Sequence, residues 1–312
     1  MRVLVTGASS FTGAWFVRAL VEAGIEVVAP CRGAADDGDP LRRARLAALP
    51  ETVRLVPKCP FGSPPFLDLI DRAGPFEALC HHAAEVGDFR RADFDVGAAL
   101  AANTAGLGAV LDRLQAGGCR TVVVTGTVFE TDEGEAGPSR AVNAYGLAKA
   151  LTWQVWRHAC EGRGFALGKF VVPAPFGPLE KPCLASSLIR SWLRGETPTV
   201  RAPHLVRDHI PASLLADDYV RFLRAVWGRS GTWYRRPSLF AESLGRFAER
   251  LAEAMRPRLE LPCPVEIADP PVQVDEPVSR VNRDPLVQDG LAAFWDGYAG
   301  WWQRALKGDF NL

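Results

Sequence analysis

The sequence predicts an α/β protein built on a doubly wound parallel sheet, and three observations lead to that prediction. Short β-branched runs alternate with longer segments whose apolar residues recur at helical spacing. A glycine-containing turn joins the first of these runs to the first helical segment. The 312 residues suffice for one large α/β unit or two moderate domains. Strands and helices in strict alternation favour a parallel sheet with right-handed crossovers.

The strands of this sheet are expected in the first half of the chain, because buried parallel strands are continuous apolar runs. The expected strands are Arg2–Thr6, Glu26–Ala29, Val53–Val56, Ala78–His82, Thr121–Thr125 and Phe165–Val172. The helices between them are expected at Gly13–Ala23, Phe66–Ala73, Gly97–Leu114 and Ala144–Glu161.

The pattern changes after Val172, where prolines cluster at positions 173, 175, 178 and 182. Proline disfavours regular helix, so this stretch is expected to leave the sheet as a loop. Helical spacing returns at Leu184–Arg194, Pro211–Val226 and Leu244–Met255. We therefore predict two domains, residues 1–172 and 173–312. The second is a smaller α/β lobe over the carboxyl edge of the sheet, where open α/β sheets bind ligands.

Composition excludes several classes of function. Lysine plus arginine equals aspartate plus glutamate, 36 each, so net charge gives no reason to expect nucleic acid or membrane as partner. The seven cysteines are scattered and form no Cys-x-x-Cys pair, which argues against disulfides and against a metal site. We expect no signal peptide before the first strand, and no apolar stretch approaches the ~18 residues of a spanning helix. We expect a cytoplasmic protein.

The turn TGASSFTG, residues 6–13, is a candidate site for a dinucleotide pyrophosphate. It follows the first strand and opens the first helix, where backbone N–H groups and the positive helix end meet an anion. Gly7 permits the tight turn, and Gly13 permits close packing of helix and strand. Its predicted cofactor contacts are Gly7, Ser9, Ser10, Phe11, Thr12 and Gly13. The sheet is thus predicted to be of the Rossmann type, with residues 1–172 as the dinucleotide-binding domain.

The end of the second strand bears on which dinucleotide binds. NAD sites usually carry a carboxylate there for the ribose 2′-OH. This chain has none, and Arg32 follows Pro30 and Cys31 instead. A guanidinium suits a 2′-phosphate, so NADP is the preferred cofactor and NAD the alternative. The other interpretation of Arg32 is an exposed loop arginine.

The candidate catalytic pair is Tyr145 and Lys149, which lie four apart and share a helical face. A lysine ammonium beside a tyrosine is expected to lower the phenol pKa from its usual value of about 10. Tyr145 can then exchange a proton with a substrate hydroxyl or carbonyl while a nicotinamide exchanges hydride. Thr125, at the end of a strand, is placed to hydrogen-bond the same oxygen or to cap its own backbone. Asn103 is expected to bridge either backbone or cofactor.

Together these features resemble the extended short-chain dehydrogenase/reductase family of nucleotide-sugar epimerases, dehydratases and reductases. The matching segments are TGASSFTG (6–13), HHAA (81–84), NTAGL (103–107), VVVTGTVF (122–129), YGLAK (145–149), FGP (176–178), RDHI (207–210) and a terminal helix (284–298). The resemblance implies that the amino-terminal lobe holds the cofactor and the carboxyl-terminal lobe a nucleoside-diphosphate sugar. It also implies a homodimer formed through the helices that contain NTAGL and YGLAK.

The resemblance assigns roles to individual residues. Tyr145 is implied as the acid/base, Lys149 as its electrostatic partner and a ribose contact, and Thr125 as the hydroxyl that orients the substrate. Ala83 and Tyr145 join the implied cofactor contacts, and Thr127 is an implied substrate contact. Arg207 is a candidate substrate contact that could face the phosphates of the sugar nucleotide or pair with Asp208.

The chain departs from the family pattern at several positions. Ser10 replaces the usual middle glycine of the turn, so the pyrophosphate has to be approached past a hydroxymethyl group. Ala174 stands where members often carry a substrate-binding asparagine. The segment from Pro57 to Pro60 lacks the usual adenine-contacting aspartate. These departures bear on the substrate more than on the chemistry.

Two chemistries remain open. Family dehydratases carry an Asp-Glu pair directly after the active-site threonine, and decarboxylases carry a glutamate; here Gly126 and Thr127 occupy these positions. We therefore expect an epimerase that acts by transient oxidation to a keto intermediate, or alternatively an NADPH-dependent reductase of a keto-sugar nucleotide. A non-enzymatic NADP(H)-binding protein is the third interpretation.

Overall fold

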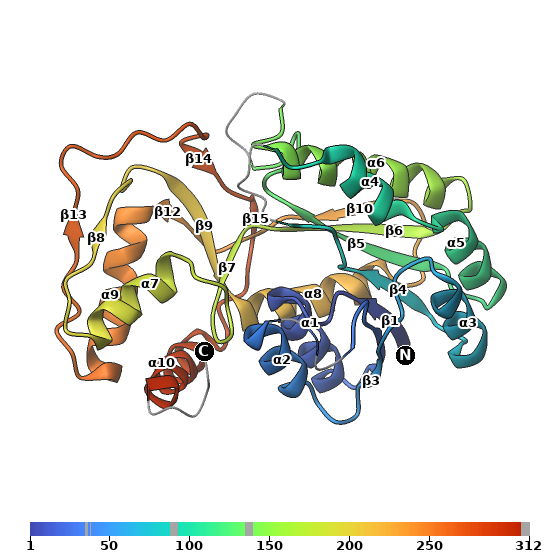
Figure 1. Ribbon diagram of the computed structural model, residues 1–312, viewed down its shortest axis with the longest axis horizontal. Coiled ribbons are helices and arrows are strands. Elements are labelled where there is room, and N and C mark those ends of the chain that lie inside the picture. The colour runs from blue at the N-terminus through green and yellow to red at the C-terminus, as the bar shows by residue number, and fades with distance from the viewer. Residues whose placement is uncertain (35–36, 38, 88–92, 135–139, 307–312) are drawn as a thin grey trace. The chain divides into compact units, whose positions relative to one another are not determined.

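The computed structural model describes residues 1–34, 37, 39–87, 93–134 and 140–306 (Figure 1). The chain divides into two compact units. Unit 1 comprises Met1–Glu133, Ser139–Val172 and Ala216–Arg236, and unit 2 comprises Gly134–Pro138, Pro173–Leu215 and Pro237–Leu312. Residues 216–236, which were expected in the C-terminal lobe, thus belong to the unit that contains the glycine turn.

Unit 1 is built on a parallel sheet, as predicted. Within the described residues the sheet has seven strands, in the order β10-β6-β5-β4-β1-β2-β3. The strands are β1 (Arg2–Thr6), β2 (Glu26–Pro30), β3 (Arg54–Val56), β4 (Ala78–His81), β5 (Thr121–Thr127), β6 (Ala166–Val172) and β10 (Thr232–Arg235). All neighbouring pairs run parallel. The α/β class and the Rossmann-type sheet are therefore confirmed.

Helices cover both faces of this sheet (Figure 1). They are α1 (Phe11–Glu22), α2 (Pro40–Ala47), α3 (Pro64–Ala73), α4 (Val96–Thr104), α5 (Leu107–Ala116), α6 (Ala144–Glu161) and α8 (Ala212–Val226), whose first residues belong to unit 2. On one face Phe16 of α1 stacks on Tyr219 of α8 at 4.2 Å, and both rings contact Phe170 of β6. On the other face α3, α5 and α6 bury a continuous apolar core that includes Trp153 and Trp156.

The single helix expected over Gly97–Leu114 is wrong, because it breaks into α4 and α5. Gly106 adopts φ +64°, which ends the helical path between them. The cause is a close backbone contact: a Cβ on Gly106 would lie 2.5 Å from the Gly62 carbonyl oxygen, and one on Gly62 would lie 1.9 Å from that of Ala105. Only glycine fits such an approach at positive φ.

Sequence patterns also missed α2 and β10. Helix α2 is short, and Asp39 caps it by accepting a hydrogen bond from the Arg42 N–H at 2.8 Å. Strand β10 pairs with β6 over Thr232–Arg235 and carries the exposed aromatic side chains Trp233 and Tyr234. A strand with such exposed side chains lacks the apolar run that marked the other strands.

Unit 2 is a smaller α/β assembly. Strands β7 (Ala174–Phe176) and β14 (Ser279–Arg280) pair parallel with β9 (Val206–Pro211), and β12 (Phe240–Ser243) pairs antiparallel with it. Short pairs join β8 (Thr199–Val200) to β13 (Glu266–Ile267) and β11 (Pro237–Ser238) to β15 (Asp284–Pro285). Helices α7 (Leu184–Leu193), α9 (Leu244–Leu259) and α10 (Leu291–Leu306) share one aromatic core around Phe176.

None of the helices described is both long enough and apolar enough to cross a membrane.

Candidate functional site

The glycine turn after β1 is shaped by close backbone packing. Gly7 has φ +82°, and a Cβ there would lie 2.8 Å from the Ala83 nitrogen. A Cβ on Gly13 would lie 2.1 Å from the Gly7 carbonyl oxygen. Both positions therefore require glycine, as the motif predicted. The structure also brings Ala83, which follows β4, against the turn.

Ser10 occupies the middle of this turn without strain, because its backbone is extended with φ −77°. Its Oγ donates to the Gly7 carbonyl oxygen at 2.9 Å and accepts from the Gly13 N–H at 3.1 Å. The hydroxyl thus caps α1, which begins at Phe11, and its second hydrogen bond is made to the loop that precedes the helix. Phe11 and Thr12 lie in the first helical turn, where N–H groups have no acceptor within the helix. This arrangement suits an anion such as a pyrophosphate.

Two adjacent histidines of the HHAA segment pack beside this turn. His82 Nε2 lies 2.9 Å from the Thr12 hydroxyl, and His81 Nδ1 lies 3.1 Å from that of Thr6. Burial, with the Lys149 charge as a smaller cause, lowers the pKa of His82 to about 3. His82 is therefore neutral near pH 7 and fixes the Thr12 side chain. The bond to Thr12 joins residues 70 apart in sequence, so no local pattern indicated it.

Helix α6 carries the predicted catalytic pair. Asn143 caps it by accepting from the Gly146 N–H at 2.8 Å. A Cβ on Gly146 would lie 2.0 Å from the Phe129 carbonyl oxygen, so the start of the helix packs directly on the loop after β5. Tyr145 lies edge-to-face with Phe94 and Phe129.

Lys149 and Thr125 meet at the carboxyl end of β5. Lys149 is buried, and its Nζ donates to the Thr125 carbonyl oxygen at 2.6 Å. The Thr125 Oγ1 atom is buried and has no hydrogen-bond partner within the part of the chain that is described. Thr125 therefore does not cap its own backbone there. β5 also continues two residues beyond the expected end, to Thr127, because β6 pairs with it as far as Val172.

The electrostatics of the pair differ from expectation. Burial, followed by the charge of Glu130, raises the pKa of Tyr145 above its ordinary value. Burial lowers the pKa of Lys149, while Glu130 raises it and Lys169 lowers it. The predicted lowering of the tyrosine pKa by Lys149 is thus wrong for this structure. The physical reason is that desolvation of the phenol outweighs any favourable charge.

The structure places Asn103 as a backbone bridge. Its Oδ1 accepts from the Glu85 N–H at 2.7 Å, and its Nδ2 donates to the Thr152 Oγ1 at 3.2 Å. It therefore ties α4 both to the segment after β4 and to α6. Of the two roles expected for Asn103, these contacts support the backbone bridge.

Arg32 lies just beyond β2 with its side chain 80% exposed. Its Nη1 is 2.8 Å from the Glu85 Oε2, a contact between two solvated groups.

Thr127, the implied substrate contact, donates its backbone N–H to the Glu130 Oε1 at 2.8 Å. Glu130 is buried, and no sequence pattern had singled it out.

Arg207 lies in unit 2, and its guanidinium is engaged in holding neighbouring backbone. It donates to the carbonyl oxygens of Val206 and Val278, and it lies 2.9 Å from the carboxylate of Glu276. Asp208 accepts backbone N–H groups rather than pairing with Arg207. The substrate contact of Arg207 stays a prediction.

Comparison with known proteins agrees with this geometry. Residues 3–229 match the NAD dependent epimerase/dehydratase family. The chain belongs to that family. No curated protein sequence is similar enough to the chain to count as a match.

Solved structures of this family share the fold. A UDP-glucose-4-epimerase from Stenotrophomonas maltophila, bound to NAD and formylated UDP-arabinopyranose, is 18% identical with a TM-score of 0.73, and the match covers 99% of each chain. UDP-glucose 4-epimerase from Thermotoga maritima with UDP-glucose is 17% identical with a TM-score of 0.72, over 98% of this chain and 100% of that one. DesIV, a dTDP-glucose 4,6-dehydratase from Streptomyces venezuelae with NAD and TYD bound, is 20% identical with a TM-score of 0.69, over 100% and 99%.

Proposed function

We propose that this protein is an NAD(P)-dependent oxidoreductase acting on a nucleotide-activated sugar, and that it works as an epimerase through transient oxidation to a keto intermediate. The observation that carries the proposal is the contact of the Lys149 ammonium with the Thr125 carbonyl at the end of β5, at the sheet edge where the glycine turn lies. Tyr145 stands one turn before Lys149 on the same helix, α6. The epimerases of the same fold that were solved with UDP-sugars support the choice of substrate class.

Each catalytic residue has a distinct task in this proposal. Tyr145 exchanges a proton with the reacting oxygen of the sugar. The buried Thr125 Oγ1, without a protein partner among the described residues, hydrogen-bonds that oxygen. Lys149 holds a positive charge beside them. When bound, the nicotinamide supplies the hydride acceptor and donor. The cradle of Gly7, Gly13 and Ala83 and the start of α1 would hold its pyrophosphate.

Dehydration fits this site poorly. Gly126 stands where a dehydratase has its first acid, and the space beside it is filled: a Cβ there would lie 2.7 Å from Lys169 Cε and 2.9 Å from Glu130 Oε1. Net reduction of a keto-sugar needs the same three residues as epimerisation. It is therefore the second candidate, favoured by the exposed Arg32 if NADP is the cofactor.

A screen of nucleotide sugars and their 4-keto forms, followed by mass spectrometry and NMR, tests the function. Absorbance near the nicotinamide band is recorded in parallel. An epimer formed without net change in the cofactor supports the epimerase, and a reduced sugar with stoichiometric loss of NADPH supports the reductase. If the protein binds neither dinucleotide and converts no sugar, the proposal is wrong.

We propose NADP as the preferred cofactor, with NAD as the alternative that the solved relatives bind. Arg32→Ala should weaken NADP(H) binding about tenfold or more, since a hydrogen bond to a charged group is worth about 1.5–3 kcal/mol. Binding of NAD(H) should change little. The ion pair with Glu85 is solvated and costs little to break. Fluorescence titration of both dinucleotides measures the ratio, with Arg72→Ala on α3, also exposed, as control. Equal losses for both dinucleotides would remove the argument.

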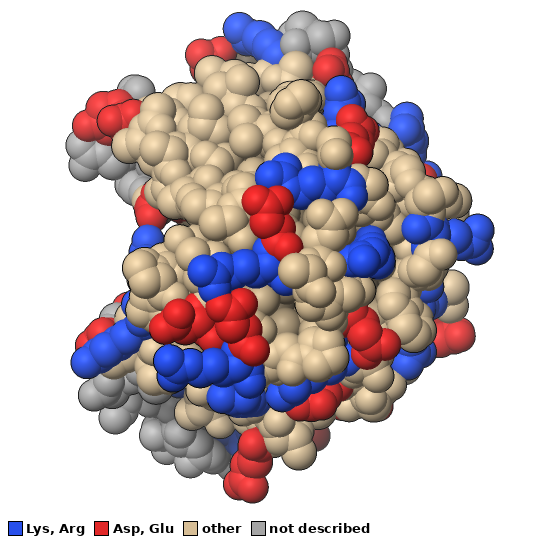
Figure 2. Space-filling model, turned by 90° about the vertical axis from the view of Figure 1, so that its right-hand side faces the viewer, with Lys and Arg blue, Asp and Glu red and all other residues tan. Residues whose placement is uncertain are grey.

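We propose further that two copies pair through α4 and α6. Leu147, Leu151 and Val155 recur every four residues on α6 and are each about two-fifths exposed. In Figure 2 the upper part of the face, at the height where α4 and α6 lie in Figure 1, shows a wide area without charged side chains. An uncovered apolar stripe of this kind is typical of an association surface.

Leu151→Glu should therefore shift the protein from dimer to monomer, because it places a charge within the stripe. Sedimentation velocity or light scattering after size-exclusion chromatography measures the mass. Val287→Glu, at an exposed valine of unit 2, is the control and should leave the mass unchanged. A Leu151→Glu protein with the mass of the unchanged protein would contradict the proposed dimer.

A further inference from the structure

Four charged side chains form a chain of contacts within unit 1. Lys169 Nζ lies 2.7 Å from a Glu130 carboxylate oxygen and 2.8 Å from one of Glu133. Arg236 continues the chain, with its Nε 2.5 Å from the second Glu133 oxygen. The side chains of Glu130, Glu133 and Lys169 are all less than 5% exposed. Because a buried charge without a partner is strongly destabilising, each of these side chains is held against a partner of opposite charge.

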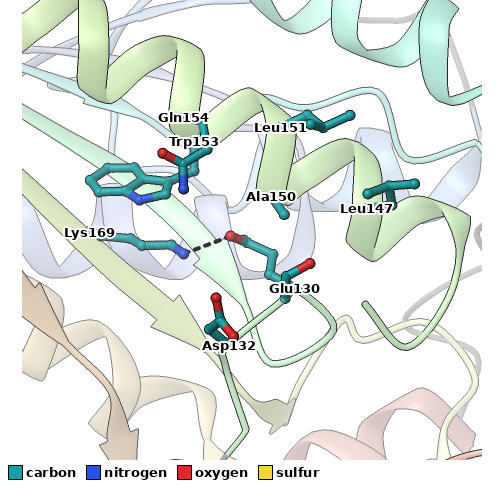
Figure 3. Close-up of a pocket in the computed structure, with 9 residues that line it drawn as sticks. Glu130, Asp132, Leu147, Ala150, Leu151, Trp153, Gln154 and Lys169 are labelled. Carbon is teal, nitrogen blue, oxygen red and sulfur yellow. Dashed lines mark ion pairs between the residues drawn. The ribbon is translucent and has the colours of Figure 1, made fainter. Parts of the chain in front are cut away.

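The pair of Glu130 and Lys169 borders a cavity of about 190 Å³ beside α6. Figure 3 shows the Lys169 ammonium and the Glu130 carboxylate facing each other, with the Trp153 ring alongside. Lys169 Nζ lies 5.2 Å from the centre of the Trp153 ring, within the range of a cation–π contact. Helix α6, which carries Tyr145 and Lys149, thus supplies one wall around the pair.

Glu130 reaches the backbone of the catalytic strand directly. Its Oε1 accepts the Thr127 N–H at 2.8 Å, two residues beyond Thr125. Lys149 holds the Thr125 carbonyl at 2.6 Å. The last three residues of β5 are therefore held at both ends, at Thr127 by the Glu130 carboxylate and at Thr125 by the Lys149 ammonium. Gly126 lies between these two contacts, and a side chain there would collide with Glu130 and Lys169.

Glu130 also acts on the pair through its charge. Within the described part of the chain, the charges that act on Lys149 are Glu130, which follows β5, and Lys169 on β6. Lys149 in turn acts on His81 and His82 at the end of β4. Both histidines have pKa values lowered by burial and are neutral. Glu130 is therefore the negative charge that offsets Lys169 at the Lys149 ammonium.

We propose that Glu130 is a positioning residue for the reaction: it fixes the backbone at Thr125–Thr127 and sustains the positive charge of Lys149. This inference rests on the proposed function of Tyr145 and Lys149. Lys169 is the counterpart that holds the Glu130 carboxylate in place while opposing the charge on Lys149. The two residues thus have opposite effects on one ammonium group.

The test uses the full chain labelled with ¹³C at the lysine ε-carbon. The sequence contains five lysines, and the Lys149 signal is assigned by its loss in Lys149→Arg. In Glu130→Gln, which keeps an acceptor for the Thr127 N–H, the pKa of Lys149 should fall relative to the unchanged protein. In Lys169→Met, which keeps the apolar stem, it should rise. Glu26→Gln, at an exposed carboxylate, is the control and should leave the Lys149 titration in place.

The sign of the shift decides between positioning and a merely structural role. If Glu130→Gln only loosened the fold, water would reach Lys149 and its pKa would rise toward the ordinary value, in the same direction as in Lys169→Met. A rise in both variants, or no change in either, overturns the proposal. Far-UV circular dichroism and the urea midpoint identify a variant that fails to fold, and Glu130→Met then serves as the second substitution with the same expected sign.

The measurement needs no substrate, so it separates the two proposals. If a sugar is turned over, kcat of Glu130→Gln should fall about tenfold with KM nearly unchanged, because alignment rather than binding is lost. An unaltered kcat in a protein that turns over its sugar overturns the positioning role. If no sugar is converted but the opposite shifts of Lys149 are found, the proposed function fails and the Glu130–Lys149 coupling stands.

Discussion

Tyr145→Phe should reduce turnover by two to four orders of magnitude, about the contribution of a well-placed general acid or base. The substitution keeps the aromatic ring and its edge contacts with Phe94 and Phe129, so the packing around residue 145 should be retained. The glycine turn lies on a different element, and dinucleotide affinity should change less than about threefold. Steady-state kinetics and a dinucleotide titration on the same preparation measure both quantities.

Tyr234→Phe is the matched control for this experiment. Tyr234 also lies in unit 1, but it is exposed on the edge strand β10. Losing its hydroxyl should leave both turnover and dinucleotide affinity unchanged. Full activity in Tyr145→Phe would remove the proposed mechanism, and a matching loss in Tyr234→Phe would mean that the assay reports folding rather than proton transfer.

The raised pKa of Tyr145 bears on the direction in which the residue works first. A buried phenol with a raised pKa stays protonated near pH 7 and is ready to donate a proton to a carbonyl oxygen. To accept a proton from a sugar hydroxyl it needs a stronger positive charge nearby. Lys149 has three N–H donors, and one of them is directed at the Thr125 carbonyl. Glu130 sustains the charge on Lys149, but its own negative charge also raises the pKa of Tyr145, so Glu130 favours the protonated phenol that donates a proton in the reduction step.

The local signals in the sequence predicted the fold well where an element is long or strictly periodic. Helix α6 begins and ends at the predicted residues, Ala144 and Glu161. Patterning failed where a distant contact decides the outcome, as at the break between α4 and α5, where Gly106 meets Gly62. No window around residue 106 contains that information.

The candidate site shows the same division between local and distant information. Gly7, Gly13, Tyr145 and Lys149 stand in motifs whose spacing is visible in the chain. Glu130 stands in a loop among other acidic residues, and its burial depends on Lys169, which lies on another strand. A glutamate in such a loop would ordinarily be solvated. The change from a solvated to a buried, paired carboxylate is made by tertiary packing alone.

Gly13→Ala should both destabilise unit 1 and abolish dinucleotide binding. The added Cβ would lie 2.1 Å from the Gly7 carbonyl oxygen and 2.7 Å from Ser10 Oγ, and backbone has to move to admit it. Overpacking of this kind typically costs about 1–3 kcal/mol of unfolding free energy. The same movement displaces the first turn of α1, whose N–H groups would meet the pyrophosphate. Urea denaturation and dinucleotide titration measure the two losses.

Gly297→Ala distinguishes the steric effect from a general effect of replacing glycine in a helix. Gly297 lies within α10, and a Cβ there meets no described atom within 4 Å. Alanine has the higher helix propensity, so this variant should gain roughly 0.5–1 kcal/mol of stability. The two substitutions add the same methyl group to a helical glycine with opposite expected signs. Equal stability of Gly13→Ala and the unchanged protein would show that the turn tolerates a side chain, and the close approach of Gly7 and Gly13 could then no longer be the reason for glycine in the motif.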